Sequence, residues 1–315
     1  MSRRPGWARL AITAPVVVAH VLLPVFLLGQ MPGASREGPM AWLSLFLVAA
    51  GFFPFILLAG AWSWFGRVPR ALLAALFVAI AGWTRPHGLG GALTAGIGSF
   101  DLLLSIALGG LFGALALFAL RGRALRDPAL DLAFPLRGGV FHVGQGGASR
   151  AVNYHFAHPS QRYALDIVML NGAGARARGL YPAQLERYAI WRAEVVSPCD
   201  GVVAAAVDGL ADRPPPERDP AHPAGNHIAI ESAGATIYLA HLMQGSLLVR
   251  AGDRVRAGQP LGRVGNSGNT TEPHLHVHAE RGPYPGRFSG RPGLPIRFGG
   301  RFLVRNDRVR AVAPR

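Results

Sequence analysis

Long apolar runs fill roughly the first 120 positions and restrict what this part of the chain can fold into. Three of them extend over residues 10–28, 40–64 and 102–120. A helix of about 20 apolar residues crosses the ~30 Å hydrocarbon core of a bilayer, so each run is long enough to span a membrane. We therefore predict that residues 1–126 form a multi-pass anchor in the cell membrane, with three or four transmembrane helices and the lipid bilayer as a partner.

A fourth apolar run, residues 71–83, is bracketed by Arg70 and Arg85 and is too short to span a bilayer alone. It is either re-entrant or part of a helix that extends across its flanks. Arginines precede the first run, separate the second run from this one and follow the last run. Four crossings would put both ends of the chain on the arginine-rich inner side, whereas three crossings would put the carboxyl-terminal half outside. The sequence leaves the side open.

The formal charge of +15 comes entirely from arginine, because the sequence contains no lysine. Arginine without lysine indicates a bias in base composition more often than a surface selected for nucleic acid, although it also favours anionic lipid or an anionic wall polymer. No basic helix, zinc-finger spacing or RNA-stacking motif accompanies the charge, so we expect no nucleic-acid partner. The single cysteine, Cys199, excludes an internal disulfide and a cysteine-ligated zinc site.

The chain changes character after residue 126. Residues 127–135 are predicted to be a linker and residues 136–315 an all-β domain with an antiparallel sheet, because short alternating segments between Gly, Pro and Asn replace the apolar runs. Two insertions interrupt the pattern, a basic stretch at 172–188 and a proline-rich stretch at 208–225 that is predicted to be an exposed loop. The predicted strands are residues 139–143, 194–196, 201–204, 227–230, 236–240 and 260–264.

A histidine-rich stretch at residues 265–278 carries the strongest chemical signal. Its first half is rich in Gly and Asn, which tolerate positive φ and predict a turn, and the alternation that follows predicts a strand. Alternate residues of a strand point to the same side, so His274, His276 and His278 are expected to share one face. Imidazoles on one strand face are suited to a catalytic zinc site, which needs a ligand nitrogen and a second base beside it.

Two other segments carry residue types that ligate metals. One is residues 153–166, which contains His155, His158 and Asp166, and the other is residues 238–242, which contains His241. A catalytic zinc site takes three protein ligands of nitrogen or oxygen type and leaves one position open. The three segments can meet this need without cysteine.

Residues 140–280 resemble the lysostaphin-type zinc metallopeptidases, which cut peptidoglycan cross-bridges. The resemblance includes the strand Val196-Ser-Pro-Cys-Asp-Gly-Val-Val203, the strand Gly225-Asn-His-Ile-Ala-Ile230 and the hairpin at 252–262. The His-Leu-His at 274–276 is the most specific element. The resemblance implies a lysostaphin-type fold, one Zn²⁺ per chain and a zinc endopeptidase acting on peptidoglycan stem or cross-bridge peptides, with its catalytic domain facing the periplasm or cell wall.

The resemblance also implies roles for single residues. It makes Asp166 and His276 zinc ligands, and it makes His241 and His274 the pair that positions and polarises water or stabilises the tetrahedral intermediate. Where the family usually has a histidine, in the pattern His-x-x-x-Asp, this chain has Arg162. The first ligand must then be His155 or His158. We favour His155, because its surroundings resemble a membrane-linked branch of the family with a longer loop.

The other histidines have milder interpretations. His227 and His278 are candidates for groups that line the groove and hydrogen-bond to the ligands, whereas His142 and His222 are expected to be solvated or packed.

Other classes of protein fit the sequence less well. A biotinyl or lipoyl carrier needs a lysine, which is absent, and a sugar phosphotransferase carrier would not need Asp166. The main alternative is a zinc-free, inactive module of the same fold that binds wall or activates another hydrolase. All candidate ligands are present, which favours the enzyme.

Overall fold

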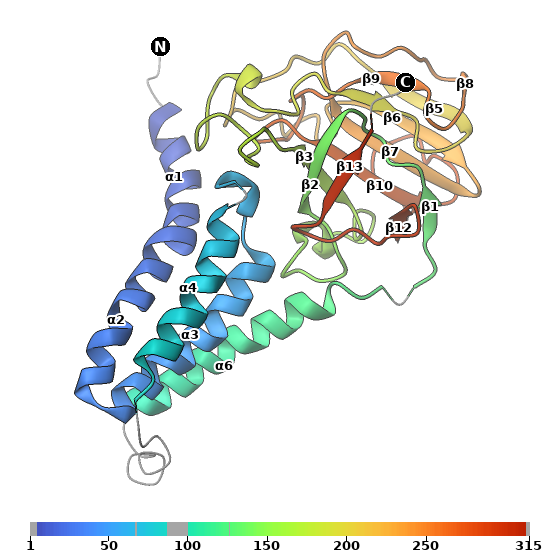
Figure 1. The fold of residues 1–315 in the computed structure, drawn as a ribbon. Coiled ribbons are helices and arrows are strands. Elements are labelled where there is room, and N and C mark those ends of the chain that lie inside the picture. Colours follow the sequence, from blue (N-terminus) through green and yellow to red (C-terminus); the bar gives the residue numbers. More distant parts are fainter. Residues whose placement is uncertain (1–4, 67, 87–99, 126, 313–315) are drawn as a thin grey trace.

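The computed structural model describes residues 5–66, 68–86, 100–125 and 127–312 of the chain. It consists of an amino-terminal bundle of long helices and a carboxyl-terminal β domain that rests on one end of the bundle (Figure 1). The predicted division into an α-helical part and an all-β part is confirmed.

Three helices are long and apolar enough to cross a membrane. The first is continuous over Trp7–Glu37, and the other two are Pro39–Ala59 and Phe100–Arg121. A shorter apolar helix, Val68–Thr84, covers the doubtful fourth run and extends it across both flanks, as one of the two alternatives predicted. The helical elements are α1 (Pro5–Val17), the π-helical η1 (Val18–Leu22), α2 (Leu23–Glu37), α3 (Pro39–Ala59), the 3-10 helix η2 (Trp62–Trp64), α4 (Val68–Thr84) and α6 (Phe100–Arg121).

The predicted span at 40–64 is corrected at its end, because α3 stops at Ala59 and Trp62–Trp64 form a separate 3-10 turn. Gly60 adopts an extended backbone after its N–H has bonded to the Ile56 carbonyl, which ends the helix. This turn brings the chain to the β domain.

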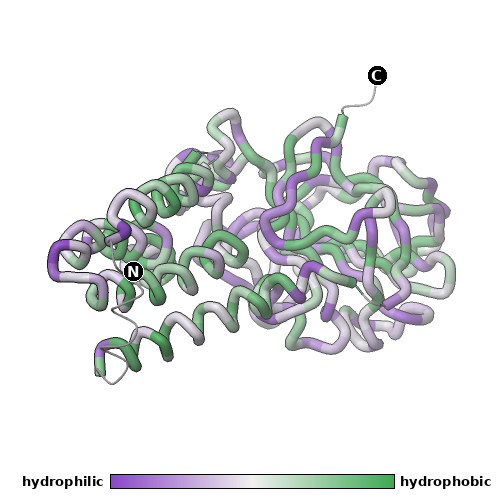
Figure 2. The backbone as a smooth tube through the Cα atoms, turned by 60° about the horizontal axis from the view of Figure 1, so that its bottom comes forward, coloured by the Kyte–Doolittle hydropathy of each residue, from purple (hydrophilic) through white to green (hydrophobic). Residues whose placement is uncertain are grey.

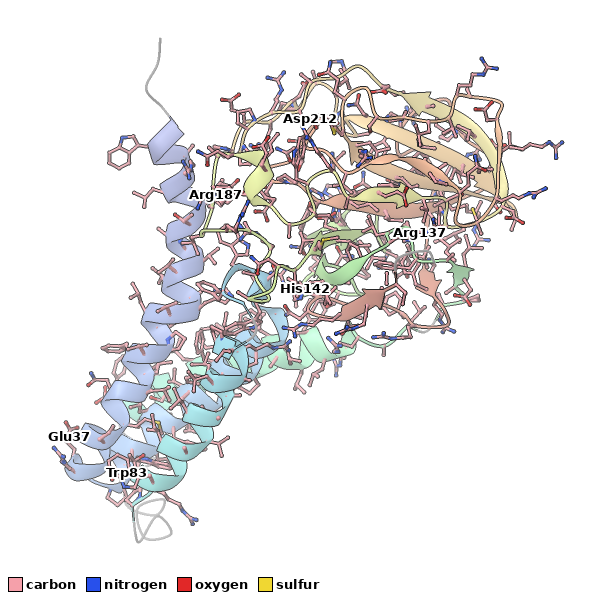
Figure 3. The ribbon with its side chains drawn as sticks, turned by 45° about the horizontal axis from the view of Figure 1, so that its top comes forward. Glu37, Trp83, Arg137, His142, Arg187 and Asp212 are labelled. Carbon is pink, nitrogen blue, oxygen red and sulfur yellow. The ribbon has the colours of Figure 1, made fainter. Side chains whose placement is uncertain are left out.

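The helices run alternately up and down the bundle. The Trp42 indole at the start of α3 donates to Thr84 at the end of α4, so these helices are antiparallel. Gly109 lets α6 approach α3 closely, because a Cβ there would collide with the backbone of Leu47. Glu37 and Trp83 lie together at the far end of the bundle (Figure 3). The start of α1 and the β domain therefore lie at the same end.

Many large apolar side chains of the helices are exposed. The tube of the helical part is coloured mostly as hydrophobic (Figure 2). Val78, Leu103 and Leu111 are each more than half exposed. Exposed apolar faces on long helices are stable in lipid rather than in water, so these faces support membrane association.

The β domain is built on a nine-stranded sheet in which every described pairing is antiparallel, as predicted. The order is β13-β2-β3-β10-β7-β6-β5-β8, and β11 also pairs with β10. The strands of this sheet are β2 (Gly139–Gln145), β3 (Leu165–Met169), β5 (Gly201–Val207), β6 (Asn226–Ser232), β7 (Ala235–Leu242), β8 (Arg254–Val255), β10 (Leu275–Arg281), β11 (Gly293–Leu294) and β13 (Arg308–Ala311). A small separate sheet pairs β4 (Glu194–Val196) with β9 (Pro260–Arg263).

The predicted linker at 127–135 contains a strand. Here β1 (Leu130–Leu132) pairs in parallel with β12 (Ile296–Phe298), and Leu132 is buried in the main core. The stretch is therefore part of the β domain. Its three-residue strand is too short to produce a visible alternation in the sequence.

The proline-rich loop at 208–225 is held against the turn at 265–268 rather than standing free. Asp212, labelled in Figure 3, accepts hydrogen bonds from the backbone N–H groups of Gln244 and Asn266. Gly225 lies so close to Ser267 that a side chain at 225 would collide with its backbone. The prediction of an exposed loop is thus correct only for part of the segment, because Ala224 and Gly225 are buried.

Candidate metal centre

The position of β10 in the middle of the sheet brings three chain segments to one point. His276 on β10 lies directly opposite Asp166 on β3 and opposite Ala240 on β7. His241 follows Ala240, and His274 immediately precedes β10. Directly opposed residues in antiparallel strands have neighbouring side chains. The strand register therefore places His276 beside Asp166 and brings the segments of His241 and His274 close to them.

His155, Asp166 and His276 form a buried group that can hold a metal ion, with their ligand atoms within 4.8 Å of one another. The His155 Nε2 lies 3.1 Å from each carboxylate oxygen of Asp166. The His276 Nδ1 lies 2.9 Å from Asp166 Oδ1. Two imidazole nitrogens and one carboxylate oxygen are a donor set that zinc accepts in catalytic sites, so the residues fit that metal.

His155 reaches this group from a short 3-10 helix, η3 (Tyr154–Ala157). The Asn153 side chain accepts a hydrogen bond from the His155 backbone N–H and donates to the carbonyls of Gly147 and Ala164, each 3.1 Å away. These bonds fix the longer loop in which the family pattern is interrupted. His158 is exposed and lies outside the group, so of the two candidates His155 is the one next to Asp166.

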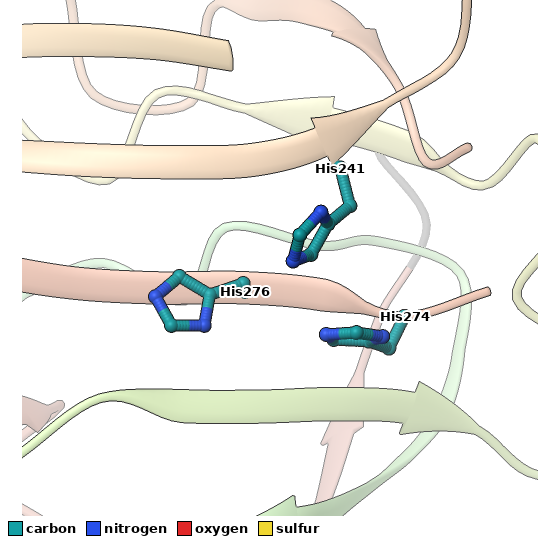
Figure 4. A group of neighbouring side chains, drawn as sticks. All are labelled: His241, His274 and His276. Atoms are coloured by element: carbon teal, nitrogen blue, oxygen red, sulfur yellow. The ribbon is translucent and has the colours of Figure 1, made fainter. Parts of the chain in front are cut away.

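His241 and His274 lie beside the first group, and with His276 they form a second set of ligand atoms within 4.8 Å (Figure 4). The His241 and His274 ring centroids are 4.8 Å apart. The His241 Nδ1 donates to the Ser267 carbonyl at 2.9 Å, and the His274 Nδ1 donates to the Glu272 carbonyl at 2.9 Å. Each ring is therefore anchored through Nδ1 and turns its Nε2 toward the group of candidate ligands, with the His274 Nε2 3.5 Å from Asp166 Oδ1.

The His241 backbone is strained. Its φ is +62°, in the left-handed region that side chains other than glycine rarely adopt. The Ala224 carbonyl accepts its backbone N–H at 3.0 Å and helps to hold this conformation. Such strain is characteristic of functional positions where the surroundings dictate the backbone.

The surroundings lower the pKa values of three titratable groups in the site. Burial alone would raise the pKa of Asp166, but His155 and His274 beside it hold that pKa well below its ordinary value. Burial lowers the pKa of His276 to about 3, and burial with the neighbouring His274 holds the pKa of His241 well below normal. The carboxylate is therefore ionised and these two imidazoles are neutral, which are the forms that bind metals.

A row of polar side chains continues along β10 behind His276. The His276 Nε2 and the His278 Nδ1 are 3.0 Å apart, and the His278 ring stacks on Tyr238 at 4.5 Å. Glu280 follows at the same spacing, fully buried, with the backbone N–H of Gly290 donating to it. His278 thus contacts the candidate ligand and helps to set its orientation. Glu280 was not singled out in the sequence, although it continues the same alternation.

A cavity of about 490 Å³ opens on this group. Asp166, His274 and Tyr154 line it, and the Tyr154 hydroxyl donates to Asp166 Oδ2 at 3.2 Å. The opposite wall comes from the helical part of the chain, namely Val16, Gly60, Ala61, Ser63 and Trp64. Sequence reasoning missed Tyr154 and this wall.

The remaining histidines lie as follows. His227 is buried near the row on β10, with its Nδ1 donating to the Gly225 carbonyl at 2.8 Å. His142 is buried where the β domain meets the bundle, and His222 is largely exposed and bonds Asp219.

Part of the β domain that contains these histidines matches a known peptidase family. Residues 189–285 match the model for Peptidase family M23. The chain carries a peptidase M23 domain of the lysostaphin type. The match contains His241, His274 and His276, whereas His155 and Asp166 lie before it.

Several solved structures are similar to parts of the chain. The solution structure of lysostaphin has 20% identity over 41% of this chain and 40% of that one, with a TM-score of 0.26. A zinc-containing peptidase from Vibrio cholerae has 22% identity over 37% of this chain and 46% of that one, with a TM-score of 0.23. The M23 metalloprotease pseudoalterin has 17% identity over 58% of this chain and 99% of that one, with a TM-score of 0.33. The chain thus spans less than half of the first two proteins.

Proposed function

We propose that the chain is a zinc-dependent endopeptidase that hydrolyses peptide bonds in the stem or cross-bridge peptides of peptidoglycan. The observation that carries this proposal is the convergence of His155, Asp166 and His276 beside a second pair, His241 and His274. Asp166 and His274 from this group line the cavity. The M23 domain supports the peptidase class and the wall substrate.

The proposed ligands are His155, Asp166 and His276, which would hold one zinc ion per chain. When bound, zinc would polarise the scissile carbonyl and lower the pKa of a water molecule at its open position. Asp166 contributes the negative charge of the site. The His278 ring keeps the His276 imidazole in its orientation through the contact between their nitrogens.

His241 and His274 carry the proton transfers in this proposal. Both rings are anchored through Nδ1, so each Nε2 can take a proton from the attacking water or give one to the leaving amine. Once its Nε2 has taken up a proton, either ring can donate that N–H to the carbonyl oxygen and stabilise its negative charge in the transition state. Tyr154 also lines the cavity, and its hydroxyl supports the Asp166 carboxylate by donating to Oδ2.

Cleavage of purified peptidoglycan by the full chain in detergent tests the proposal. We expect new amino termini to appear with wild-type protein, and none above background with His276→Ala. The exposed His158 supplies the matched control, because His158→Ala should cleave as wild type does. A wild-type protein that binds zinc and releases no new amino termini from wall peptides would contradict the proposed substrate.

The proposed substrate requires the β domain to face the periplasm or cell wall. Arg9, Arg70 and Arg121 lie toward the β-domain end of the bundle, which by the positive-inside rule favours the cytoplasm for that end. That rule is weak for a large domain that follows the spans, so we place the domain outside on the strength of its substrate. A reporter enzyme that works only outside the cytoplasm can be fused after Arg315 to test this placement, and we expect it to be active. An inactive fusion, with a reporter that works only in the cytoplasm active at the same position, would exclude peptidoglycan as the substrate.

A further inference from the structure

The turn that follows α3 is bound tightly to the β domain. The Asn306 side chain donates to the carbonyls of Leu58 and Gly60, at 3.0 and 3.1 Å. The Arg176 backbone N–H donates to the Ser63 carbonyl at 2.8 Å. Since this turn also lines the cavity that contains Asp166 and His274, the helical part of the chain reaches the site itself.

Trp64, the last residue of the 3-10 turn, packs against two side chains of the β domain. The Arg176 guanidinium lies 3.6 Å from the centre of its ring. The Tyr181 ring stacks on it with a centroid distance of 5.4 Å and an interplanar angle of 3°. The Trp64 ring thus contacts a cation and a phenol ring at the same time.

Both of these side chains hold the loop that precedes the histidine-rich strand. The Arg176 Nε donates to the carboxylate oxygens of Glu272 at 2.9 and 2.8 Å, and only 1% of the Arg176 side chain is exposed. The Tyr181 hydroxyl donates to the Thr271 carbonyl at 2.7 Å. Two successive residues of the loop are therefore tied to groups that rest on Trp64.

The same loop orients His274. The Glu272 carbonyl accepts the His274 Nδ1 proton at 2.9 Å, and it also accepts the Thr270 hydroxyl at 2.8 Å. A shift of this carbonyl would turn the imidazole, and with it the Nε2 that lies 3.5 Å from Asp166 Oδ1. The contacts form one continuous path from Trp64 through Arg176 and Glu272 to His274.

We propose that Trp64 is a positioning residue for His274, so that the helical part of the chain completes the active site rather than only anchoring it. Without the indole face, the buried Arg176 and the Tyr181 ring lose the surface that restricts them. The 270–272 loop then gains conformations in which His274 is misdirected. Small displacements of a catalytic group are costly because the rate depends on its alignment with the reacting atoms.

Rate measurements on the full chain in lipid nanodiscs form the first test. Tyr181 does not itself line the cavity that contains Asp166 and His274. Tyr181→Phe removes the hydroxyl that donates to the Thr271 carbonyl and should lower kcat on the order of tenfold with KM little changed. Tyr188→Phe is the matched control, because its hydroxyl donates to the Pro182 carbonyl instead and kcat should stay at the wild-type value. Trp64→Leu should lower kcat at least as far, and Trp64→Phe, which keeps an aromatic face, should restore most of it.

Hydrogen exchange of backbone amides supplies a readout that does not need activity. We expect the backbone amides of residues 270–274 to exchange faster in Trp64→Leu and Tyr181→Phe than in wild type. Exchange in β7 of these variants, and exchange at 270–274 in the control Tyr188→Phe, should equal that of wild type. The rate measurements rest on the proposed peptidase function, whereas the exchange measurements do not. An inactive wild type would refute that function, and the exchange rates would then decide whether Trp64 positions His274. Unchanged exchange at 270–274 in both variants would show that Trp64 only anchors the domains to each other.

Discussion

The helical bundle leaves large apolar side chains on its outside, whereas the β domain buries charged and polar side chains in its interior. Val78 is 70% exposed on α4, yet the Glu280 side chain is 0% exposed on β10. Lipid explains the first arrangement, because apolar faces need no partner there. Burying charged and polar side chains costs free energy unless each group is hydrogen-bonded or paired. A cluster of buried His, Asp and Glu therefore indicates a functional site rather than a stabilising core.

Removing one polar group from the β interior should therefore separate chemistry from metal binding. We expect His274→Ala to keep its zinc and to lose about 10²- to 10⁴-fold in cleavage rate, because a positioned proton-transfer group is gone. His276→Ala should lose both metal and activity. Metal analysis beside peptide release measures the two effects, and full activity of His274→Ala would refute its assigned role.

Asn153 tests the energetic cost of buried polar groups in the β domain, because it is buried and hydrogen-bonded but is not one of the proposed metal ligands. Asn153→Ala leaves the carbonyls of Gly147 and Ala164 unpaired and frees the His155 loop, at a cost of about 2–3 kcal/mol in the free energy of unfolding. Asn171→Ala is the control, because it removes three hydrogen bonds of the same kind from a half-exposed loop, where water can replace them. It should cost less than about 1 kcal/mol. Equal decreases in the free energy of unfolding of the two variants, measured by denaturant titration, would show that the buried hydrogen bonds of Asn153 stabilise the protein no more than exposed ones do.

The smallest predicted effect concerns pH at the junction of the two regions. Burial, together with Arg308 and Arg305, lowers the pKa of His142 to about 3. The folded protein keeps this ring neutral while the unfolded chain protonates it below pH 6.5, so stability is complete above pH 6.5 and is lost as the pH falls toward 3. Between pH 6.5 and 5 the loss is about 1.5 kcal/mol.

His142→Phe should remove this part of the acid sensitivity. Unfolding free energies of the two proteins, measured from pH 8 to 5, should diverge only below pH 6.5. The control His158→Phe changes an exposed ring in the loop after His155 and should follow wild type. Parallel curves for wild type and His142→Phe would contradict the neutral, buried state of this imidazole.

Alternation and the His-Leu-His motif made His276 on β10 and its neighbour His274 visible in the sequence, whereas Asp166 was assigned through the family resemblance. The sequence could not decide between His155 and His158, since that depends on how Asn153 folds a loop. The strand β3 was missed because Leu165–Met169 is buried on both faces and does not alternate. Trp64 and Glu272 were missed for a different reason. They meet through Arg176, across long sequence separations that no local pattern records.

The metal content of the full chain tests the central claim most directly. We predict one zinc per chain in wild-type protein purified without chelator, and none in Asp166→Ala or His276→Ala, with folding checked by circular dichroism. Wild-type protein that is folded and carries no zinc, even after zinc is supplied, would contradict the account of the β domain as a metallopeptidase.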